Sequence, residues 1–449
     1  MRKKAGPLDI YKYLPKINCK KCGEKTCMAF SSQLIERKVE LKDCPHLKRE
    51  SFKALEEILA PAVREVVFGK PTVSVGGEKV LYRHELTYFN QTAIAIDIHD
   101  EMGKEELSKR IEFVNNFAHE RIGETLTLQA IAIRNRSGDV EKFDKCVEET
   151  AKRTKKALIL CSWNSESLDK ALRIVGDKKP LVYAATKNTW KEVGELAVKY
   201  NCPVVAFADN DISELKSVVN ALQRMGINDI VIDPGSHLDS CTLNNFVMLR
   251  RSATNEDKVL NRPILGIPAA VYLQSGDGLK EAMAASLMMA KYADLIILHN
   301  IEIWALLPNI TLRQNLYTDP RRPVRVEAGL KEFGSPDENS PVLLTTNFAL
   351  TYYTVASDIE SAKVDCYLIV LDTNGIGVEA AVAGRQLSAS RVKKVIDETG
   401  IEKKIRHKKM VIPGLAARIS GELEQLSGWK VLIGPKDSSE IGRFIERER

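Results

Sequence analysis

The chain has 449 residues, of which 44% are hydrophobic and 28% are charged, and a formal net charge of +6 at pH 7. This composition is ordinary for a globular protein of two to four domains. The apolar stretches have the length of strands, and none approaches the roughly 20 residues that cross a bilayer, so the sequence excludes insertion into a membrane.

Four cysteines are clustered in the first tenth of the chain, and a proline follows the last of them. They are Cys19, Cys22, Cys27 and Cys44. The spacing C-x2-C-x4-C-x16-C predicts the ligands of a [4Fe-4S] cluster, because each iron of a cuboidal cluster has one open position and prefers soft sulfur. Gly23 allows a tight loop around three corners, and a helix expected from Thr26 to Arg37 would carry the third cysteine at its start.

Structural zinc is the main alternative for these cysteines. A zinc site usually has two C-x2-C pairs, whereas only the first pair here has that spacing. Core cysteines without any metal are a third possibility. The other five cysteines stand singly, mostly in apolar runs: Cys146, Cys161, Cys202, Cys241 and Cys366. An odd total of nine and no secretory segment predict a protein of a reducing compartment, the cytoplasm, without disulfides.

The positive charge is concentrated around the cysteine cluster. Residues 1–60 contain 14 Lys and Arg against 8 Asp and Glu, and the remainder of the chain is close to neutral. A metal cluster with four thiolates is anionic, so these lysines would offset its charge and dock a low-potential electron donor. Nucleic acid is not an expected partner, because the basic residues are not interleaved with aromatic side chains for stacking.

Between residues 92 and 300 one pattern repeats: a short apolar run, a polar turn and a longer amphipathic stretch. Two of the amphipathic stretches, Ser165 to Val175 and Lys187 to Lys199, have apolar residues at helical spacing. Eight strands alternating with helices over about 200 residues predict a closed (β/α)8 TIM-type barrel, and an open doubly wound sheet is the alternative. The predicted strands are Thr92 to Asp97, Thr127 to Ile133, Ala157 to Cys161, Leu181 to Ala185, Pro203 to Ala208, Asp229 to Ile232, Pro263 to Ile267 and Leu295 to Leu298.

Polar residues follow most of these predicted strands. In a barrel they would lie at the C-terminal face, where ligands bind, although each one alone is explained as a cap of the next helix. No Ser-His-Asp spacing, H-E-x-x-H motif or carboxylate pair gives them a catalytic order. They are Asp97, His99, Arg134, Asn135, Trp163, Asn164, Asp209, Asn210, Asp233, Ser236, His237, His299 and Asn300.

After a connector at Asp319 to Arg325, the pattern restarts in four short units. Each strand ends in a turn rich in Thr, Asn, Gly or Pro, and the second turn leads into a long helix expected from Val378 onward. A Rossmann-like parallel sheet would bring these turns together at its carboxyl edge, where such sheets bind ligands. The four predicted strands are Pro341 to Thr345, Cys366 to Leu371, Met410 to Ile412 and Val431 to Ile433.

The second of these turns contains the sequence N-G-I-G, with glycines at Gly375 and Gly377. Paired glycines let the backbone approach a large flat or anionic ligand at a helix N-terminus. A nucleotide fingerprint would be incomplete, because Ala380 takes the third glycine's place and no convincing acidic residue follows. A plain strand-to-helix turn and a cradle for another large cofactor are the other two interpretations.

In these features the chain resembles the large (gamma) subunit of the corrinoid iron-sulfur protein, part of the acetyl-CoA decarbonylase/synthase (CO dehydrogenase/acetyl-CoA synthase) complex. The similarity covers the whole chain. It is most specific at Leu14 to Cys19, Cys27 to Phe30, Leu344 to Tyr352, Ile412 to Ala417 and Gly434-Pro435. The resemblance implies a [4Fe-4S] domain at 1–60, a TIM barrel at 61–325 and a corrinoid-binding α/β domain at 326–449.

The resemblance also implies a corrinoid-dependent methyltransferase component. A Co(I) corrinoid (cobamide) would accept a methyl group from a methyl-tetrahydropterin, of the tetrahydrosarcinapterin or tetrahydrofolate type, and pass it to the nickel centre of acetyl-CoA synthase. The [4Fe-4S] cluster would reactivate Co(II). The corrinoid-binding residues carried over by motif are Thr345, Thr351, Gly375, Ile376, Gly377 and Val378, with Gly414 and Gly434 as helpers.

The partners implied by the family are a small (delta) subunit, forming a heterodimer, the CO dehydrogenase and acetyl-CoA synthase subunits, and the methyl-pterin or its methyltransferase. An iron-sulfur electron-transfer or regulatory protein with a nucleotide-binding α/β domain is the alternative function. A reducible cluster without corrinoid uptake would be the mark of that alternative.

Overall fold

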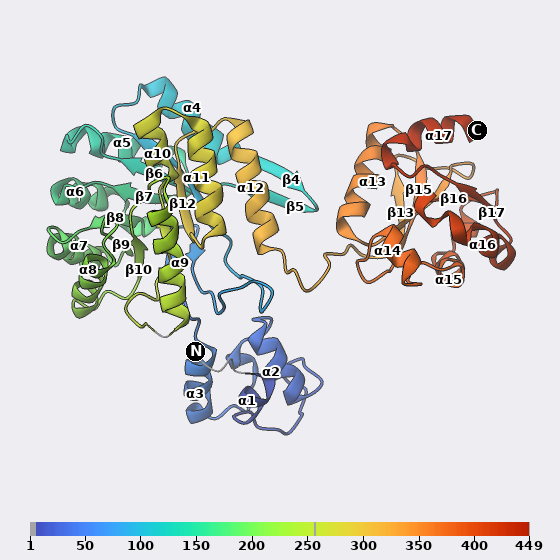
Figure 1. Ribbon diagram of the computed structural model, residues 1–449, viewed down its shortest axis with the longest axis horizontal. Coiled ribbons are helices and arrows are strands. Elements are labelled where there is room, and N and C mark those ends of the chain that lie inside the picture. The colour runs from blue at the N-terminus through green and yellow to red at the C-terminus, as the bar shows by residue number, and fades with distance from the viewer. Residues whose placement is uncertain (1–5, 256, 449) are drawn as a thin grey trace. The chain divides into compact units, whose positions relative to one another are not determined.

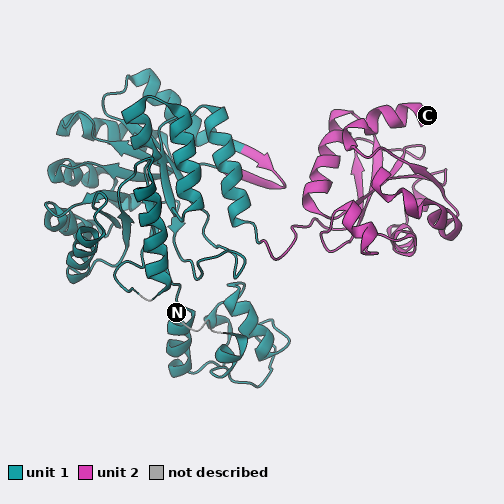
Figure 2. Ribbon diagram, in the orientation of Figure 1, with its two compact units in different colours: residues 1–118, 127–319 teal, residues 119–126, 320–449 magenta. Residues whose placement is uncertain are grey.

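A computed structural model describes residues 6–255 and 257–448 of the chain. The chain divides into two compact units (Figure 2), of which the first takes in residues 1–118 and 127–319 and the second residues 119–126 and 320–449. No helix among the described residues is long and apolar enough to cross a membrane.

The cysteine region is a small helical module within the first unit. Its helices are α1 (Pro7–Tyr11), α2 (Cys27–Ile35) and α3 (Arg49–Leu59), with a 3-10 turn at η1 (Leu41–Asp43). The hydroxyl of Thr26 caps α2 by accepting a hydrogen bond from the Ala29 amide at 3.0 Å, which satisfies a free amide of the first turn. The helix expected from Thr26 to Arg37 is therefore confirmed, two residues shorter at its end.

The barrel is the body of the first unit (Figure 1). Eight strands pair in the order β10-β9-β8-β7-β6-β3-β12-β11, every pair parallel, and a bridge between Ile232 and Ile264 joins the two ends. Closure confirms the predicted TIM-type barrel, and the open-sheet alternative is wrong. The strands are β3 (Ala93–His99), β6 (Ala130–Arg134), β7 (Ala157–Cys161), β8 (Leu181–Ala185), β9 (Val204–Phe207), β10 (Ile230–Asp233), β11 (Leu265–Gly266) and β12 (Leu295–Leu298).

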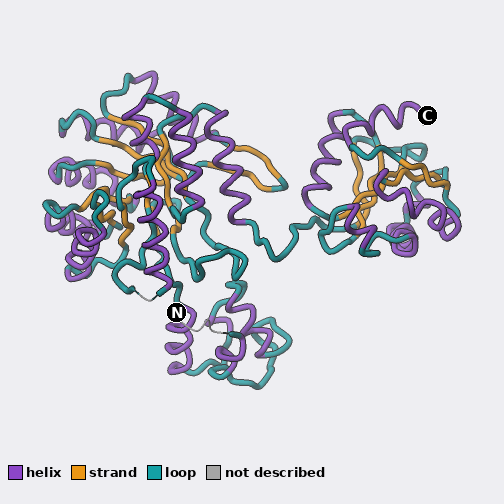
Figure 3. The backbone as a smooth tube through the Cα atoms, viewed as in Figure 1, coloured by secondary structure: helices purple, strands orange, loops and turns teal. Residues whose placement is uncertain are grey.

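Helices cover the outside of the barrel (Figure 3). Several begin at an Asp or Asn whose side chain accepts a backbone N–H of the first turn, as Asn164 does before α6. The helices are α4 (Lys104–Asn116), α5 (Val140–Arg153), α6 (Ser165–Val175), α7 (Trp190–Tyr200), α8 (Ile212–Arg224), α9 (Ser240–Thr254), α10 (Pro268–Ser275), α11 (Gly278–Ala290) and α12 (Ile303–Tyr317), with a 3-10 turn at η2 (Gly176–Lys178).

Two antiparallel hairpins lie outside the predicted pattern. The first pairs β1 (Val66–Phe68) with β2 (Val73–Val75), and its apolar residues join the interior cluster near the starts of the barrel strands. The second contains β4 (Ala118–Arg121) and β5 (Glu124–Thr127). The barrel strand predicted from Thr127 to Ile133 therefore starts only at Ala130, because Thr127 belongs to this hairpin.

The second unit contains a five-stranded sheet in the order β13-β15-β14-β16-β17. The last four strands along the chain are parallel, as the turns predicted, and β13 is an antiparallel edge strand that the sequence reading missed. The Rossmann-like arrangement is thus confirmed. The strands are β13 (Gly329–Phe333), β14 (Val342–Thr346), β15 (Cys366–Leu371), β16 (Lys409–Ile412) and β17 (Lys430–Ile433).

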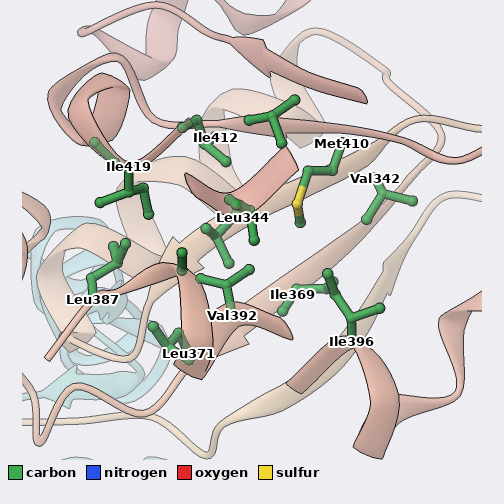
Figure 4. Packing of buried hydrophobic residues seen from close by; sticks show 14 of the residues in the cluster. Val342, Leu344, Ile369, Leu371, Leu387, Val392, Ile396, Met410, Ile412 and Ile419 are labelled. Atoms are coloured by element: carbon green, nitrogen blue, oxygen red, sulfur yellow. The ribbon is translucent and has the colours of Figure 1, made fainter. Parts of the chain in front are cut away.

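Helices cover both faces of this sheet. One apolar cluster packs β14 and β15 against α14, α15 and α16 (Figure 4), and a second packs the opposite face against α13 and α17. The helices are α13 (Ala349–Ser361), α14 (Val378–Ala383), α15 (Ala389–Thr399), α16 (Ser420–Ser427) and α17 (Ile441–Glu448), with 3-10 turns at η3 (Ile401–Lys403), η4 (Gly414–Ile419) and η5 (Ser438–Glu440).

The prediction of one long helix from Val378 onward is wrong. The segment forms two helices, α14 and α15, because the backbone at Arg385 turns into the left-handed region (φ 61°). The amide of Leu387 then donates to the carbonyl of Ala381 at 2.9 Å and closes the turn. The break lets both helices pack on the same face of the sheet.

Candidate cofactor sites

All four clustered cysteines line one pocket of the N-terminal module, together with Leu14, Asn18 and His46. Cys27 is buried at the first position of α2, and the other three thiols are half-buried. The pocket lies on the apolar core formed by Ile10, Leu14, Cys27, Phe30, Leu34 and Leu55. The structure therefore brings together the whole predicted ligand set, although its first and last members are 25 positions apart in the sequence.

Unusual backbone geometry wraps the loop around this pocket. Lys16, Asn18, Lys20 and Gly23 all have positive φ angles, of 63°, 48°, 61° and 86°. Only glycine adopts this region without a steric cost, so the three other residues are held there by their surroundings. One such contact is the side-chain oxygen of Asn18, which accepts a hydrogen bond from the Cys27 amide at 2.8 Å and joins the loop to the start of α2.

The thiols of the pocket lie close enough to influence one another. Burial raises the pKa of Cys44, and the nearby Cys22, Cys27 and Cys19 raise it further. Across the described ranges 6–255 and 257–448, no three Cys, His, Asp or Glu side chains converge on a point where they would share a single metal ion. Thiolates that each bind a different iron of a cuboidal cluster need not converge in this way, so the pocket is compatible with a cluster.

The carboxyl edge of the C-terminal sheet is the second candidate site. The chain passes from β14 to β15 on one side and then crosses to β16 on the other, so the sheet reverses direction between β14 and β16. Ligands of doubly wound sheets bind at such a switch point. These two strands share only one register pair, Leu343 with Val411, and β14 continues to Thr346 without β16 as a partner.

Two buried hydroxyls lie at this point. Thr345 is 1% exposed and Thr346 is fully buried, yet neither Oγ1 atom has a hydrogen-bond partner among the described residues. Their side chains point to opposite faces of the sheet, since strand residues alternate. A buried hydroxyl without a partner costs about 1–3 kcal/mol, so the hydroxyls at the end of β14 fit a group that binds there.

Asn347 organises the loop next to these hydroxyls. Its side-chain oxygen accepts hydrogen bonds from the Thr373 amide, the Thr373 hydroxyl and the Gly375 amide at 2.9, 3.1 and 3.0 Å. Its side-chain nitrogen donates to Asp372 Oδ1 at 2.9 Å. The side chain of Asn347 thus fixes the loop after β15 against the end of β14. Sequence reasoning placed Asn347 in a family passage but gave it no role.

The predicted residues of the N-G-I-G turn lie beside the start of α13. A Cβ atom added at Gly377 would meet Phe348 Cδ1 at 3.5 Å and Thr351 Oγ1 at 3.8 Å, both ordinary contact distances. Thr351 is half-buried, and Gly375 has the left-handed φ of 75°. Ile376 and Val378 pack with the apolar cluster on the α14 side. The first two strand-to-helix turns therefore meet, as predicted.

The other two predicted glycines have a packing reason of their own. A Cβ atom at Gly414 would lie 2.8 Å from the Gly434 carbonyl oxygen, and one at Gly434 would lie 2.7 Å from Val411 Cγ1. The Gly414 amide also donates to the Pro435 carbonyl at 2.9 Å. The turns after β16 and β17 thus touch each other and leave no room for a side chain. Their glycines would be needed with or without a ligand.

The charged residues at one side of the barrel mouth are satisfied by one another. Arg134 donates to both carboxylate oxygens of Asp97 at 3.1 and 3.0 Å, and His299 Nδ1 lies 2.9 Å from Asp97 Oδ2. Burial acts to raise the pKa of Asp97, but hydrogen bonds from His299 and Arg134 outweigh burial and lower the pKa. These residues form a closed network.

A second part of the barrel mouth is aromatic. Trp163 is 57% exposed, and its ring lies 5.4 Å from Tyr183 and 5.2 Å from Phe207. The Tyr183 hydroxyl donates to Asp233 Oδ2 at 3.0 Å, and the Gly235 amide donates to Oδ1 at 2.9 Å. Burial raises the pKa of Asp233 to about 7.

Comparison with known proteins decides the family. A family model described as "CO dehydrogenase/acetyl-CoA synthase delta subunit" matches residues 65–445, and one described as "Putative Fe-S cluster" matches residues 14–46. The chain is 48% identical to the acetyl-CoA decarbonylase/synthase complex subunit gamma of Methanothermobacter thermautotrophicus, and 98% of each chain is covered. The chain belongs to the acetyl-CoA decarbonylase/synthase gamma-subunit family.

Other relatives carry the same name. The gamma subunit of Methanosarcina acetivorans is 44% identical with 98% of both chains covered, and that of Methanocaldococcus jannaschii is 42% identical with 99% of this chain and 96% of the relative covered. Among solved structures, a dihydropteroate synthase from Xanthomonas albilineans covers 51% of this chain and 95% of its own, at 14% identity and a TM-score of 0.38.

Membership of the gamma-subunit family confirms the resemblance drawn from the sequence. It supports both expected cofactors, an iron-sulfur cluster and a corrinoid. All four clustered cysteines lie inside the matched Fe-S region. The chain is a subunit of a multi-subunit complex of acetyl-CoA metabolism. The geometry of the two sites indicates which residues could bind each cofactor.

Proposed function

We propose that this gamma-family chain carries methyl groups on a corrinoid held at the carboxyl edge of its C-terminal sheet. The methyl group would come from a methyl-tetrahydropterin and go to the nickel centre of acetyl-CoA synthase. The observation that carries the proposal is the pair of buried hydroxyls, Thr345 and Thr346, without partners at the switch point between β14 and β16. When bound, the corrinoid supplies a nucleophilic cobalt that accepts and releases the methyl group.

The chain's part in this chemistry is to hold and orient the ring. A corrin carries amide side chains at its rim, and amides match the hydroxyls of Thr345 and Thr351. Gly377 leaves an open surface beside Thr351, where a flat ligand can approach the backbone. The side-chain hydrogen bonds of Asn347 go to the loop after β15. Asn347 would therefore hold this loop in place and not bind the ligand itself.

Within residues 320–448, no histidine lies near this edge. Residues 320–449 contain one histidine, His407, which comes just before β16 at the opposite edge of the sheet. Its Nε2 atom lies 3.0 Å from the Ser340 carbonyl oxygen. Residues 320–448 would therefore hold a corrinoid through hydroxyl and backbone groups, and a cofactor held without a strong donor would be easier to reduce.

We assign Cys19, Cys22, Cys27 and Cys44 as ligands of the [4Fe-4S] cluster, which supplies an electron when the cobalt has been oxidised. The basic surface of residues 1–60 suits a low-potential electron donor. The partners in this scheme are the delta subunit, the CO dehydrogenase and acetyl-CoA synthase subunits, and the methyl-pterin or its methyltransferase. We propose the domain limits 1–60, 61–325 and 326–449 for these roles, whereas the compact units of the chain divide after residue 319.

The corrinoid assignment is tested by Gly377→Trp. The indole would fill the surface beside Thr351, so we expect loss of corrinoid retention, measured by absorption after anaerobic reconstitution, with unchanged iron content. Ser361→Trp is the matched control, since Ser361 is exposed at the far end of α13. Full corrinoid retention by Gly377→Trp would place the cradle elsewhere.

The cluster assignment is tested by Cys27→Ala. We expect loss of iron and of reactivation after oxidation, while a single methyl transfer by freshly reduced protein persists. Cys146→Ala, which changes a buried cysteine on α5 of the barrel, should keep its iron. Equal loss of single transfer and reactivation in Cys27→Ala would show a structural or direct catalytic role for the cluster.

A further inference from the structure

Four arginines among the described residues of the barrel are almost completely buried, and three of them have partners. Arg250 is 3% exposed and donates to Asp294 Oδ1 at 2.9 Å. Arg313 is 2% exposed and donates to Gln129 Oε1 at 2.7 Å, and Arg110 donates to a backbone carbonyl. These three follow the general rule that a charge inside a protein is paired or hydrogen-bonded.

Arg262 is the exception. It is 2% exposed, yet its Nε and Nη1 atoms have no hydrogen-bond partner within residues 6–255 and 257–448. Burial lowers the pKa of Arg262 to about 10, with a further lowering by Arg64 and an opposite effect of Asp229. The side chain is therefore still charged at pH 7, and a buried charge without a partner is costly.

Arg262 lies at the end of the barrel where the strands begin, which we call the barrel floor. It comes three residues before β11, at the opposite end from the mouth. The β1–β2 hairpin packs against the same segment. The Arg64 amide donates to the Asn261 carbonyl at 2.8 Å, and a Cβ atom at Gly76 would lie 2.7 Å from Pro263 Cγ. Arg64 and Arg262 are thus brought together by two backbone segments in direct contact.

Arg64 adds a second positive charge at this place. Its side chain is half-buried and forms no ion pair with a described residue. The Arg64 charge opposes that of Arg262, which is why it lowers the pKa of Arg262. The side-chain oxygen of Asn261, the residue before Arg262, is also buried without a hydrogen-bond donor. Two neighbouring guanidinium groups without a carboxylate repel each other, so an anion between them would relieve both.

We propose that Arg262 and Arg64 bind one small inorganic oxyanion of the phosphate class on the barrel floor. The planar fork of a guanidinium matches the oxygens of phosphate and forms strong, charge-assisted hydrogen bonds with them. The Asn261 side-chain oxygen can only accept, and the hydroxyl of hydrogen phosphate offers it a donor.

A carboxylate from another protein fits this place less well. An ionised carboxylate has no donor for Asn261. A side chain from another protein would also need an opening at the surface, whereas Arg262 is 2% exposed. A small ion can be taken up as the chain folds. The site is separate from both cofactor sites, because it shares no residue with the cysteine pocket or with the carboxyl edge of the C-terminal sheet.

The direct test is equilibrium dialysis of the full chain, reconstituted with iron, sulfide and corrinoid, against radiolabelled phosphate at constant ionic strength. Native protein should bind one phosphate per chain. Arg262→Met should raise the Kd about 30-fold, the value of a hydrogen bond to a charged group. Arg262→Lys keeps the charge without the fork and should raise the Kd about tenfold. Arg251→Met, which removes an exposed arginine on α9, is the matched control and should bind like native protein.

Thermal unfolding gives an independent measurement with an unusual sign. In a buffer without oxyanions, Arg262→Met should be more stable than native protein, because it replaces an unpaired buried charge by an apolar side chain of similar length. Phosphate should raise the melting temperature of native protein and not that of Arg262→Met. If Arg262→Met does not fold, Arg64→Ala serves in its place and should raise the Kd about fivefold.

Several results would overturn the oxyanion site. They are native affinity for phosphate in Arg262→Met, equal weakening in Arg251→Met, and no uptake of phosphate or sulfate by native protein. If another subunit of the complex stabilises native protein through Arg262 while phosphate does not, the occupant is a carboxylate of that subunit and the proposal is wrong. Iron and corrinoid contents should be native in every variant, and their loss in Arg262→Met would contradict the separation from the cofactor sites.

Discussion

The barrel mouth and the carboxyl edge of the C-terminal sheet are both formed by the ends of parallel strands, yet their polar groups are satisfied to different extents. At the mouth, Asp97 is held by Arg134 and His299, and Asp233 by Tyr183 and a backbone amide. At the C-terminal edge, the buried hydroxyls of Thr345 and Thr346 have no partner among the described residues. Topology alone would give both places the same chance of binding a ligand.

The two regions therefore differ in whether their buried polar groups have hydrogen-bond partners, and not in their position in the fold. A carboxylate already bound by an arginine and a histidine has little left to offer a ligand, and its loss would harm the barrel itself. A buried hydroxyl without a partner lowers stability until something binds it. The mouth has one such atom too, Asn135 Oδ1, but the amide nitrogen of the same side chain is anchored to Ser162 and Ser167.

The largest expected effect comes from Asn347→Ala. The variant loses four hydrogen bonds and leaves buried groups of the loop after β15 unpaired, so we expect about 3 kcal/mol less stability of the C-terminal unit and no corrinoid retention. Thermal unfolding and absorption measure the two effects. Corrinoid retention at the native level would contradict the role of this loop as part of the binding edge.

A smaller, pH-dependent effect is expected at the barrel mouth from Asp233→Asn. The folded pKa of about 7 lies above the ordinary 3.8, so the folded state holds a proton that the unfolded state releases, and native stability falls as pH rises from about 4 to about 7. The asparagine does not ionise, so the variant should lose this decline and gain stability relative to native protein at pH 8 compared with pH 4.

Corrinoid retention is the control for the Asp233→Asn prediction. Asp233→Asn should retain corrinoid like native protein, measured by absorption in parallel with the melting curves at both pH values. A pH-independent effect on the melting temperature would show that Asp233 is ionised in the folded barrel. Loss of corrinoid by Asp233→Asn would contradict the distinction between the barrel mouth and the C-terminal edge.

The smallest effect is expected from Thr345→Val, which should stabilise the cofactor-free protein but weaken corrinoid binding. Valine has the shape of threonine without the hydroxyl, so the cofactor-free protein should gain about 1 kcal/mol, because a buried group without a partner is removed. Corrinoid affinity should fall about tenfold, the value of one hydrogen bond. Calorimetry of the cofactor-free form and a corrinoid titration measure the two parts. A less stable variant with unchanged affinity would mean that the hydroxyl serves the fold.

Much of this organisation was visible in the sequence, and the exceptions have physical reasons. Apolar runs alternating with amphipathic stretches predicted the barrel strands, because burial on both faces leaves a continuous apolar run. The strand β13 was missed because Gly329–Phe333 is only partly buried and contains charged residues, so it does not form an apolar run. The break after Ala383 was missed although Gly384, the C-cap of α14, is a common signal for the end of a helix.

At the candidate sites the sequence predicted residue types better than roles. The cysteine spacing was sufficient to predict the ligand set, since few arrangements use four thiols in this order. The glycines at 414 and 434 looked like parts of a cradle, but backbone packing between two turns already requires them. Asn347 had no recognisable signal beyond its place directly after a strand. Its four partners become apparent only when β14 and β15 lie side by side.

The most direct test of the account is the metal content of the whole chain after anaerobic reconstitution with iron, sulfide and corrinoid. The account predicts about four irons and one cobalt per chain, with the absorption of a bound corrinoid, because the two cofactors occupy separate sites. Four irons without cobalt would contradict it and would leave an electron-transfer or regulatory protein as the function of this gamma-family chain.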